Sequence, residues 1–190
     1  LTDMARVLFC GEDQLTALRI GRELSVKNLA YDWNKNPLKK DDLLRYDLIV
    51  VHSSWKLPNL VGFIVNLVLE HDKPVIYLSS SISIGAFRSI MDDPYFAIID
   101  DQRIDAEFSI GVSLLLKTAK ALHEQANKAQ KASQRADMRR QMDECKQKLI
   151  ASGLTEEEAH RRILKTAMDR QISKYDACVF LLAGNNGETD

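Results

Sequence analysis

The chain has 190 residues, of which 45% are hydrophobic and 28% are charged, a composition typical of a globular protein with one ordinary domain and a small addition. Its formal net charge of -1 excludes a strongly basic protein, so any nucleic-acid surface must be local. No apolar run is long enough to span a bilayer, and the three cysteines lack the spacing of a zinc site or a disulfide framework, so we expect a reduced, cytoplasmic protein.

The first hundred residues alternate short β-branched runs with helical patterns. We expect strands at residues 6–10, 29–33, 47–51, 74–78 and 95–99. Helical patterns lie between them, at residues 13–26, 40–46, 58–71 and 83–91. The strand runs lack polar alternation, which indicates strands buried on both faces of a parallel sheet. Residues 4–108 are therefore predicted to form an α/β domain, a doubly wound five-stranded parallel sheet whose ligand sites lie at the carboxyl ends of the strands.

Five residues lie at those carboxyl ends, namely Gly11, Glu12, His52, Ser79 and Asp100. The arrangement resembles the flavodoxin-like receiver domain of response regulators, which carries two adjacent acids, a phosphate-accepting aspartate, a Ser or Thr, and a lysine at these places. Aspartyl phosphorylation needs a carboxylate nucleophile, bound Mg²⁺ and a cation beside the phosphoryl oxygens. Because the nucleophile and the cation are missing, we expect a pseudo-receiver with no catalytic residue, metal or cofactor, in which His52 is packed or hydrogen-bonded. Phosphorylation of His52 itself is the alternative.

Residues 104–152 contain no proline and only one glycine, which predicts a single long helix. Apolar and small residues recur there at alternating three- and four-residue steps, as in a heptad seam. The seam comprises Val112, Leu115, Ala119, Leu122, Ala126, Ala129, Ser133 and Ala136. We expect residues 109–140 to form a coiled coil that joins two copies of the chain, and a single helix folded back on the sheet is the alternative. A second seam at Met138, Met142, Cys145 and Leu149 is shifted in phase, as in a coiled-coil stutter.

The last fifty residues predict a small three-helix domain over residues 141–186. Gly153 ends the long helix, because glycine readily adopts the left-handed conformation found after helix ends. Thr155 and Glu158 have the spacing of a capping box, which starts a second helix at Glu156. A third helix is expected at residues 174–182.

The stretch KLIASGLTEEEAHRRILKTAM resembles the ANTAR module, the three-helix output domain of transcription antitermination regulators. Residues that match the family's pattern are Lys146 in the first helix, Gly153, Leu154, Thr155, Glu158 and Ala159 in the turn and cap, and Ala167 and Met168 at the end of the second helix. Cys145 departs from the alanine that the family carries before its lysine, and the third helix departs as well. The whole layout is similar to ANTAR regulators with a pseudo-receiver, the AmiR/NasT-like response regulators.

This resemblance implies a homodimer that binds paired hairpin loops in nascent transcripts and so prevents a terminator from forming. The RNA-binding residues to which it points are Lys146, Arg161, Arg162, Lys165, Ala167, Met168, Arg170 and Lys174. A pseudo-receiver without phosphate chemistry implies control by a sensor or another regulatory protein. Two other functions stay open, a DNA-binding factor with a helix-turn-helix and a protein-binding adaptor. A further interpretation has Arg161 and Lys165 paired with Glu157 and Asp169 on a solvated face.

Overall fold

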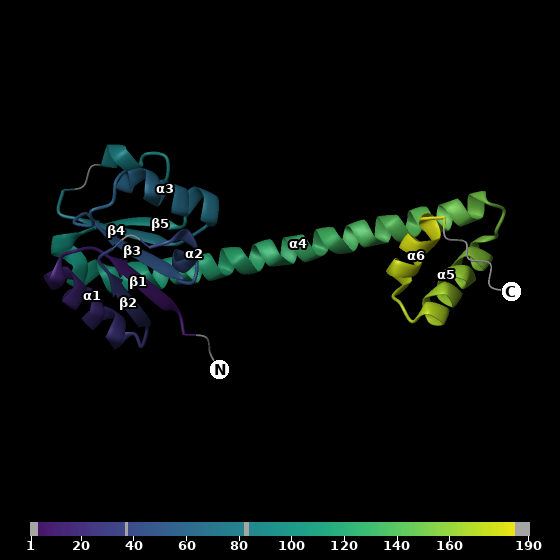
Figure 1. Cartoon of the computed structure of the whole chain (residues 1–190), viewed down its shortest axis with the longest axis horizontal. Coiled ribbons are helices and arrows are strands. Elements are labelled where there is room, and N and C mark those ends of the chain that lie inside the picture. Colours follow the sequence, from purple (N-terminus) through teal and green to yellow (C-terminus); the bar gives the residue numbers. More distant parts are fainter. Residues whose placement is uncertain (1–3, 37, 82–83, 185–190) are drawn as a thin grey trace. The chain divides into compact units, whose positions relative to one another are not determined.

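The computed structural model describes residues 4–36, 38–81 and 84–184. The chain divides into two compact units, Leu1–Glu124 and Gln125–Asp190, which we call the N-terminal unit and the C-terminal unit. The boundary falls inside the helix α4 (Ser109–Ala151), labelled in Figure 1. Residues 185 and 186, the end of the predicted three-helix domain, lie outside the described residues.

The N-terminal unit contains the predicted five-stranded parallel sheet. Its strands are β1 (Arg6–Cys10), β2 (Ala30–Asn34), β3 (Leu48–His52), β4 (Val75–Ser79) and β5 (Phe96–Asp100), in the order β2-β1-β3-β4-β5. Four of the five strands begin and end one residue later than predicted, so that they end on Asn34, His52, Ser79 and Asp100. Hydrophobicity marks where a strand is buried, but a polar residue at the end can still continue the hydrogen-bonded ladder. The strand ends therefore carry the polar residues of the site.

Helices cover both faces of this sheet, as Figure 1 shows for α1 (Gln14–Val26) and α3 (Leu60–His71). One core lies between the sheet, α1 and the first turns of α4, and includes Phe9, Ile20 and Val112. The other lies under α3 and the short α2 (Lys40–Leu43). All five residues of β3 are buried, as expected for the central strand of a sheet covered on both faces.

The helix predicted at residues 83–91 is wrong. The segment contains only a 3-10 turn, η1 (Ile84–Phe87), and residues 82 and 83 lie outside the described part of the chain. The Phe87 ring packs against the rings of Tyr77 and Phe96, at centroid distances of 4.8 and 5.2 Å. This aromatic packing overrides the local helical pattern, which Gly85 weakens.

The connection from β5 to α4 is also less regular than predicted. A 3-10 turn, η2 (Asp101–Arg103), and a π-helical turn, η3 (Ile104–Phe108), precede Ser109, where α4 begins. The π-helical turn places both Ile104 and Phe108 in the core, with no exposed surface on either side chain. Regular α-helical spacing is thus given up where burial of two large side chains requires it.

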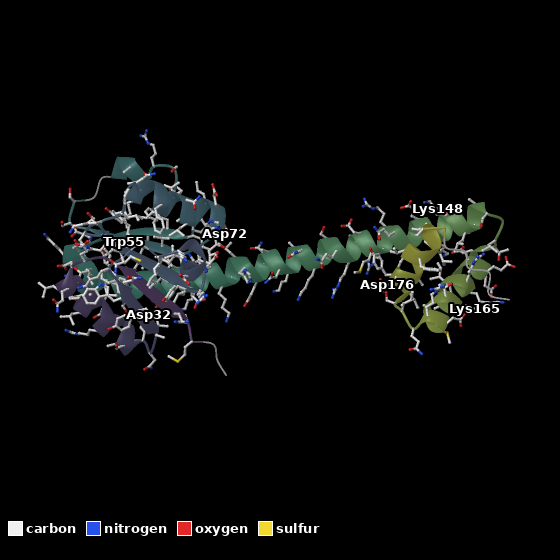
Figure 2. All side chains as sticks on the ribbon, viewed as in Figure 1. Asp32, Trp55, Asp72, Lys148, Lys165 and Asp176 are labelled. Atoms are coloured by element: carbon white, nitrogen blue, oxygen red, sulfur yellow. The ribbon has the colours of Figure 1, made fainter. Side chains whose placement is uncertain are left out.

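The predicted seam of α4 has two kinds of surroundings. Val112 and Leu115 are buried in the N-terminal unit, whereas every residue from 123 to 140 is exposed. Figure 2 shows the side chains of this middle stretch projecting from α4 into open space. None of the helices in the described part of the chain is long and apolar enough to cross a membrane.

The C-terminal unit consists of the end of α4, α5 (Glu156–Arg170) and α6 (Lys174–Leu182). Gly153 follows α4 with a φ of +102°, and Thr155 and Glu158 form the predicted capping box at the start of α5. The core residues of the three helices are Cys145, Leu149, Ala159, Ile163, Ala167, Ala177 and Cys178.

This core corrects the interpretation of the second seam as a coiled-coil stutter. Met142, Cys145 and Leu149 pack with α5 and α6 of the same chain, not in an extended coil. Met138, at the start of that seam, is 45% exposed. The apolar stripe of α4 changes phase because the first turns of α4 pack against the sheet and α1, whereas its last turns pack against α5 and α6.

Candidate functional site

His52 fills the place of the missing phosphate acceptor at the end of β3. The residue is only 6% exposed, and both ring nitrogens have partners. Nδ1 lies 2.6 Å from Ser54 Oγ and Nε2 lies 3.0 Å from Asp101 Oδ2. The ring is therefore held on both sides by polar groups.

The hydrogen bonds around Ser54 determine which ring nitrogen carries the proton. Ser54 Oγ accepts the backbone N–H groups of Glu12 and Asp13 at 3.0 and 3.2 Å, so its own hydrogen is left for His52 Nδ1. The backbone N–H of Ser54 also donates to Nδ1, at 3.1 Å. Because Nδ1 accepts both bonds, the neutral imidazole carries its hydrogen on Nε2 and donates it to the Asp101 carboxylate.

Ser54, His52 and Asp101 thus stand in the order of a serine, base and acid triad, which the sequence did not indicate. Asp101 is 49 residues from His52, and only the fold brings them together. A nucleophilic serine needs a lone pair directed at its substrate. Both lone pairs of Ser54 Oγ accept N–H bonds here, so the cluster ties the end of β3 to the start of α1 and to η2.

Gly11 and Glu12, in the place of the receiver acids, do not make a cation site. A Cβ on Gly11 would lie 2.9 Å from His52 Cβ and from the Phe9 ring, so the histidine occupies the space above this strand end. The Glu12 carboxylate pairs with Lys56 Nζ at 2.9 Å. Among the described residues, no group of three His, Cys, Asp or Glu side chains is arranged to hold a metal ion.

The structure corrects the predicted role of Asp100 at the end of β5. Asp100, predicted to face the pocket in place of the receiver lysine, instead accepts the backbone N–H of Gln102 at 2.8 Å and caps η2. Its neighbour Asp101 turns toward His52. Ser79 is buried, and its hydroxyl bonds with Ser81 of the following turn, at 3.1 and 3.2 Å. The receiver's aspartate–lysine pair across the sheet is thereby replaced by a histidine on β3 and an acid after β5.

A surface cavity of about 250 Å³ lies elsewhere, beside the edge strand β2. Asp32 on its wall accepts hydrogen bonds from Tyr46 Oη at 2.8 Å and from Arg6 at 3.2 Å. The Arg6 and Asp32 side chains are each about half exposed, so this ion pair is weak.

A second candidate surface is the outward face of α5, opposite the buried stripe of Ala159, Ile163 and Ala167. Arg161, Lys165 and Met168 follow one another there at four- and three-residue steps, and all three are exposed. Met168 is 76% exposed, so its apolar side chain forms part of this face. Figure 2 labels Lys165 on α5, with Lys148 on the neighbouring turns of α4.

The other predicted RNA-binding cations have varied surroundings. Lys146 pairs with Glu156 at the start of α5, and Arg161 pairs with Glu157 at 3.2 Å. The Arg170 guanidinium lies 3.7 Å from the centroid of the Phe180 ring, a cation–π contact. Arg162 and Lys174 are also exposed.

The predicted pairing of Lys165 with Asp169 is not formed among the described residues, although that of Arg161 with Glu157 is. Ala167 needs a correction, since it is only 8% exposed and packs in the core of the C-terminal unit. Its match to the family pattern reflects packing between helices instead of a contact with RNA.

Cys145, the departure from the family pattern, faces Cys178 of α6 within this core. All three cysteines are free thiols and are buried. Burial, together with a hydrogen bond to Cys145, raises the pKa of the Cys178 thiol to about 12. Both positions therefore act as small apolar core residues.

Solved structures similar to this chain include receiver domains and a coiled-coil fusion. A signal receiver domain of an HD domain-containing protein from Pseudomonas fluorescens Pf-5 aligns with a TM-score of 0.55 and 12% identity, covering 65% of this chain and 95% of that one. A response regulator receiver protein from Sinorhizobium medicae WSM419 aligns with a TM-score of 0.50 and 15% identity, covering 63% and 99%. A fusion that carries residues 181–211 of the yeast Spc42 trimeric coiled coil gives a TM-score of 0.51 and 14% identity, covering 70% and 92%.

At these identities the likeness shows the fold alone. The chain has the receiver fold, a five-stranded parallel sheet with flanking helices, followed by the long helix α4 and two shorter helices. No protein-family model matches the sequence, and no curated protein matches it.

Proposed function

We propose that the chain is a cytoplasmic, dimeric transcription antitermination regulator that binds hairpin-loop RNA through its C-terminal unit. The observation that carries the proposal is the exposed face of α5, on which Arg161, Lys165 and Met168 lie opposite the buried stripe. RNA loops expose phosphates and unstacked bases; arginine and lysine bind the phosphates, and the planar guanidinium of arginine also stacks on bases. The resemblance of the Gly153–Met168 segment to the ANTAR module supports the same assignment.

In this proposal the receiver fold serves as a regulatory platform without phosphate chemistry. The neutral His52 ring, held between Ser54 and Asp101, occupies the place of the phosphate acceptor. Control then passes through binding of a sensor or another regulatory protein, since any partner that prefers one arrangement of the chain shifts its population.

A gel shift tests the RNA assignment. We expect an RNA with two hairpin loops to be bound in preference to duplex DNA of the same length. Preference for the duplex would favour a helix-turn-helix factor, and binding to neither would favour a protein-binding adaptor.

The double variant Arg161→Ala, Lys165→Ala tests the surface itself. Loss of two cations that contact RNA is expected to weaken binding by about 10- to 100-fold without changing the mass of the assembly in sedimentation. Arg135→Ala, Arg139→Ala is the matched control, because these two arginines are also four residues apart and exposed on a helix. Equal losses in the two double variants would mean that total charge, and not the α5 face, determines affinity.

The dimer is proposed to form along the exposed part of the α4 seam. Small seam residues such as Ala126 and Ala129 allow two helices to approach closely, and both are exposed in the single chain. Sedimentation at micromolar concentration is expected to give a dimer, and Ala126→Glu is expected to give a monomer because it places a charge in the seam. Lys128→Glu, which lies off the seam, should leave the dimer intact, and a monomeric parent protein would contradict the proposal.

A further inference from the structure

Two of the cations assigned to RNA binding already form ion pairs with acidic side chains at the start of α5. The first turn of α5 consists of Glu156, Glu157 and Glu158. Glu157 Oε1 lies 3.2 Å from Arg161, four residues further along the same helix. Glu156 pairs with Lys146 of α4. The hydrogen bond from the Lys146 ammonium holds the pKa of the Glu156 carboxyl below its ordinary value.

The charges of α5 balance along its length. Its four carboxylates are Glu156, Glu157, Glu158 and Asp169, and its four cations are Arg161, Arg162, Lys165 and Arg170. A polyanion gains affinity from each cation that releases counterions on binding. A cation that is already paired with a carboxylate releases fewer counterions, so the helix is a weaker general RNA binder than its cations alone suggest.

Glu158 has a different task from its two neighbours. Its side chain accepts from the Thr155 backbone N–H at 2.8 Å and completes the capping box. Glu157 takes no part in the cap, is 84% exposed at its side chain, and has Arg161 as its ion-pair partner. Helix stability therefore depends on Glu158 more than on Glu157, and the two functions can be separated by mutation.

We propose that Glu157, together with Glu156, is a specificity-determining residue that discriminates against non-cognate RNA; the inference rests on the proposed function of the same surface. The carboxylates neutralise Arg161 and Lys146 in the free protein, and any RNA phosphate must displace them. An RNA that binds only through its phosphates meets this cost at each of these cations. An RNA whose loops also contact the rest of the face can bind without displacing the carboxylates, so its affinity is reduced less.

The test uses the full-length protein, a two-hairpin RNA and single-stranded poly(U) of equal length, with affinities measured from low to moderate salt. In Glu157→Gln, affinity for poly(U) is expected to rise by about three- to tenfold at low salt, and more than affinity for the hairpin RNA. The slope of log affinity against log salt is expected to steepen by about 0.7, the contribution of one freed cation on a single strand. Glu156→Gln should act in the same direction.

Two controls make the result decisive. Glu107→Gln removes a carboxylate of the N-terminal unit that pairs with Arg103 at 2.8 Å with the same four-residue spacing, and it should leave both affinities unchanged. In an Arg161→Gln background, Glu157→Gln should give a clearly smaller gain, because the cation that it neutralises is gone and only its repulsion of the RNA is removed. The far-UV circular dichroism melting midpoint should be the same for all these variants.

The outcomes separate this inference from the proposed function. Unchanged poly(U) affinity and salt slope in Glu157→Gln, or the same gain in the Arg161→Gln background, overturn the inference while hairpin binding by the parent protein stands. Absence of RNA binding by the parent protein overturns both.

Discussion

The His52 cluster of the N-terminal unit and the α5 face of the C-terminal unit both contain paired charged or polar groups, yet their surroundings differ. His52 is 6% exposed and bonded through both nitrogens to residues that further hydrogen bonds hold in place. The Arg161 side chain is 75% exposed and pairs with one flexible carboxylate. The first set of bonds is enclosed by the fold, and the second is open to exchange with a ligand.

This difference separates a cluster of mutually dependent bonds from an exposed ion pair. A buried group that loses its partner cannot turn to water, so each member of the His52 cluster depends on the others. An exposed ion pair contributes little to stability, so another charge can replace one partner at a small cost. The residue types already predicted a pocket without phosphate chemistry, and burial adds that its polar groups are occupied by one another.

The comparison is tested most strongly by His52→Ala. The change leaves the Asp101 carboxylate and Ser54 without their partner, and we expect the free energy of unfolding of the N-terminal unit to fall by about 2–3 kcal/mol. Both tryptophans of the chain, Trp33 and Trp55, lie in this unit, so tryptophan fluorescence during urea denaturation reports it selectively.

Arg161→Ala is the counterpart in the C-terminal unit. It should change stability by less than about 0.5 kcal/mol, as is usual for exposed pairs four residues apart. A loss for His52→Ala as small as that for Arg161→Ala would mean that the pocket is not the interlocked cluster described above.

A smaller effect is expected at the capping box of α5. Thr155→Ala removes the side-chain acceptor for the Glu158 N–H and should lower the stability of the C-terminal unit by about 1 kcal/mol. Far-UV circular dichroism is the measurement, with Ser152→Ala, outside the box, as the control. The unit has a small core, so this loss should be visible as a lower melting midpoint.

The capping box also predicts the direction of a pH effect. Hydrogen bonds from Thr155 hold the pKa of the Glu158 carboxyl below its ordinary value. A carboxyl whose pKa is lower in the folded state than in the unfolded state stabilises the fold at pH values above its unfolded-state pKa. This stabilisation is lost as the pH falls through the folded-state pKa. The difference in stability of the C-terminal unit between the parent protein and Thr155→Ala should therefore become smaller at acid pH. A stability difference that became larger in acid would contradict the assignment.

Much of the fold was predictable because local patterns determine it. The runs of β-branched residues indicated all five strands to within one residue, and Gly153, Thr155 and Glu158 indicated the turn and cap before α5. In both cases the signal lies within a few residues of the element that it specifies. The segment at residues 83–91 failed for the opposite reason, since packing of Phe87 against the sheet outweighs its helical pattern.

For the candidate sites, too, the sequence indicated some residues correctly and could not decide others. The sequence indicated that His52 stands where receivers carry their aspartate, and that cations gather on α5. It could not choose between Asp100 and Asp101 as the partner of His52, because that depends on how η2 turns after β5. It also placed Ala167 with the RNA-binding residues, although burial excludes it.

By itself, then, the sequence determined the parallel sheet, the long helix, the cap of α5 and the loss of the phosphate-accepting aspartate, since propensity, periodicity and residue identity are local properties. Only the tertiary structure decided that Ser54, His52 and Asp101 form one hydrogen-bonded cluster, and that the second seam of α4 packs against α5 and α6. These features depend on burial and on contacts between distant segments, and chain connectivity specifies neither until the core has formed.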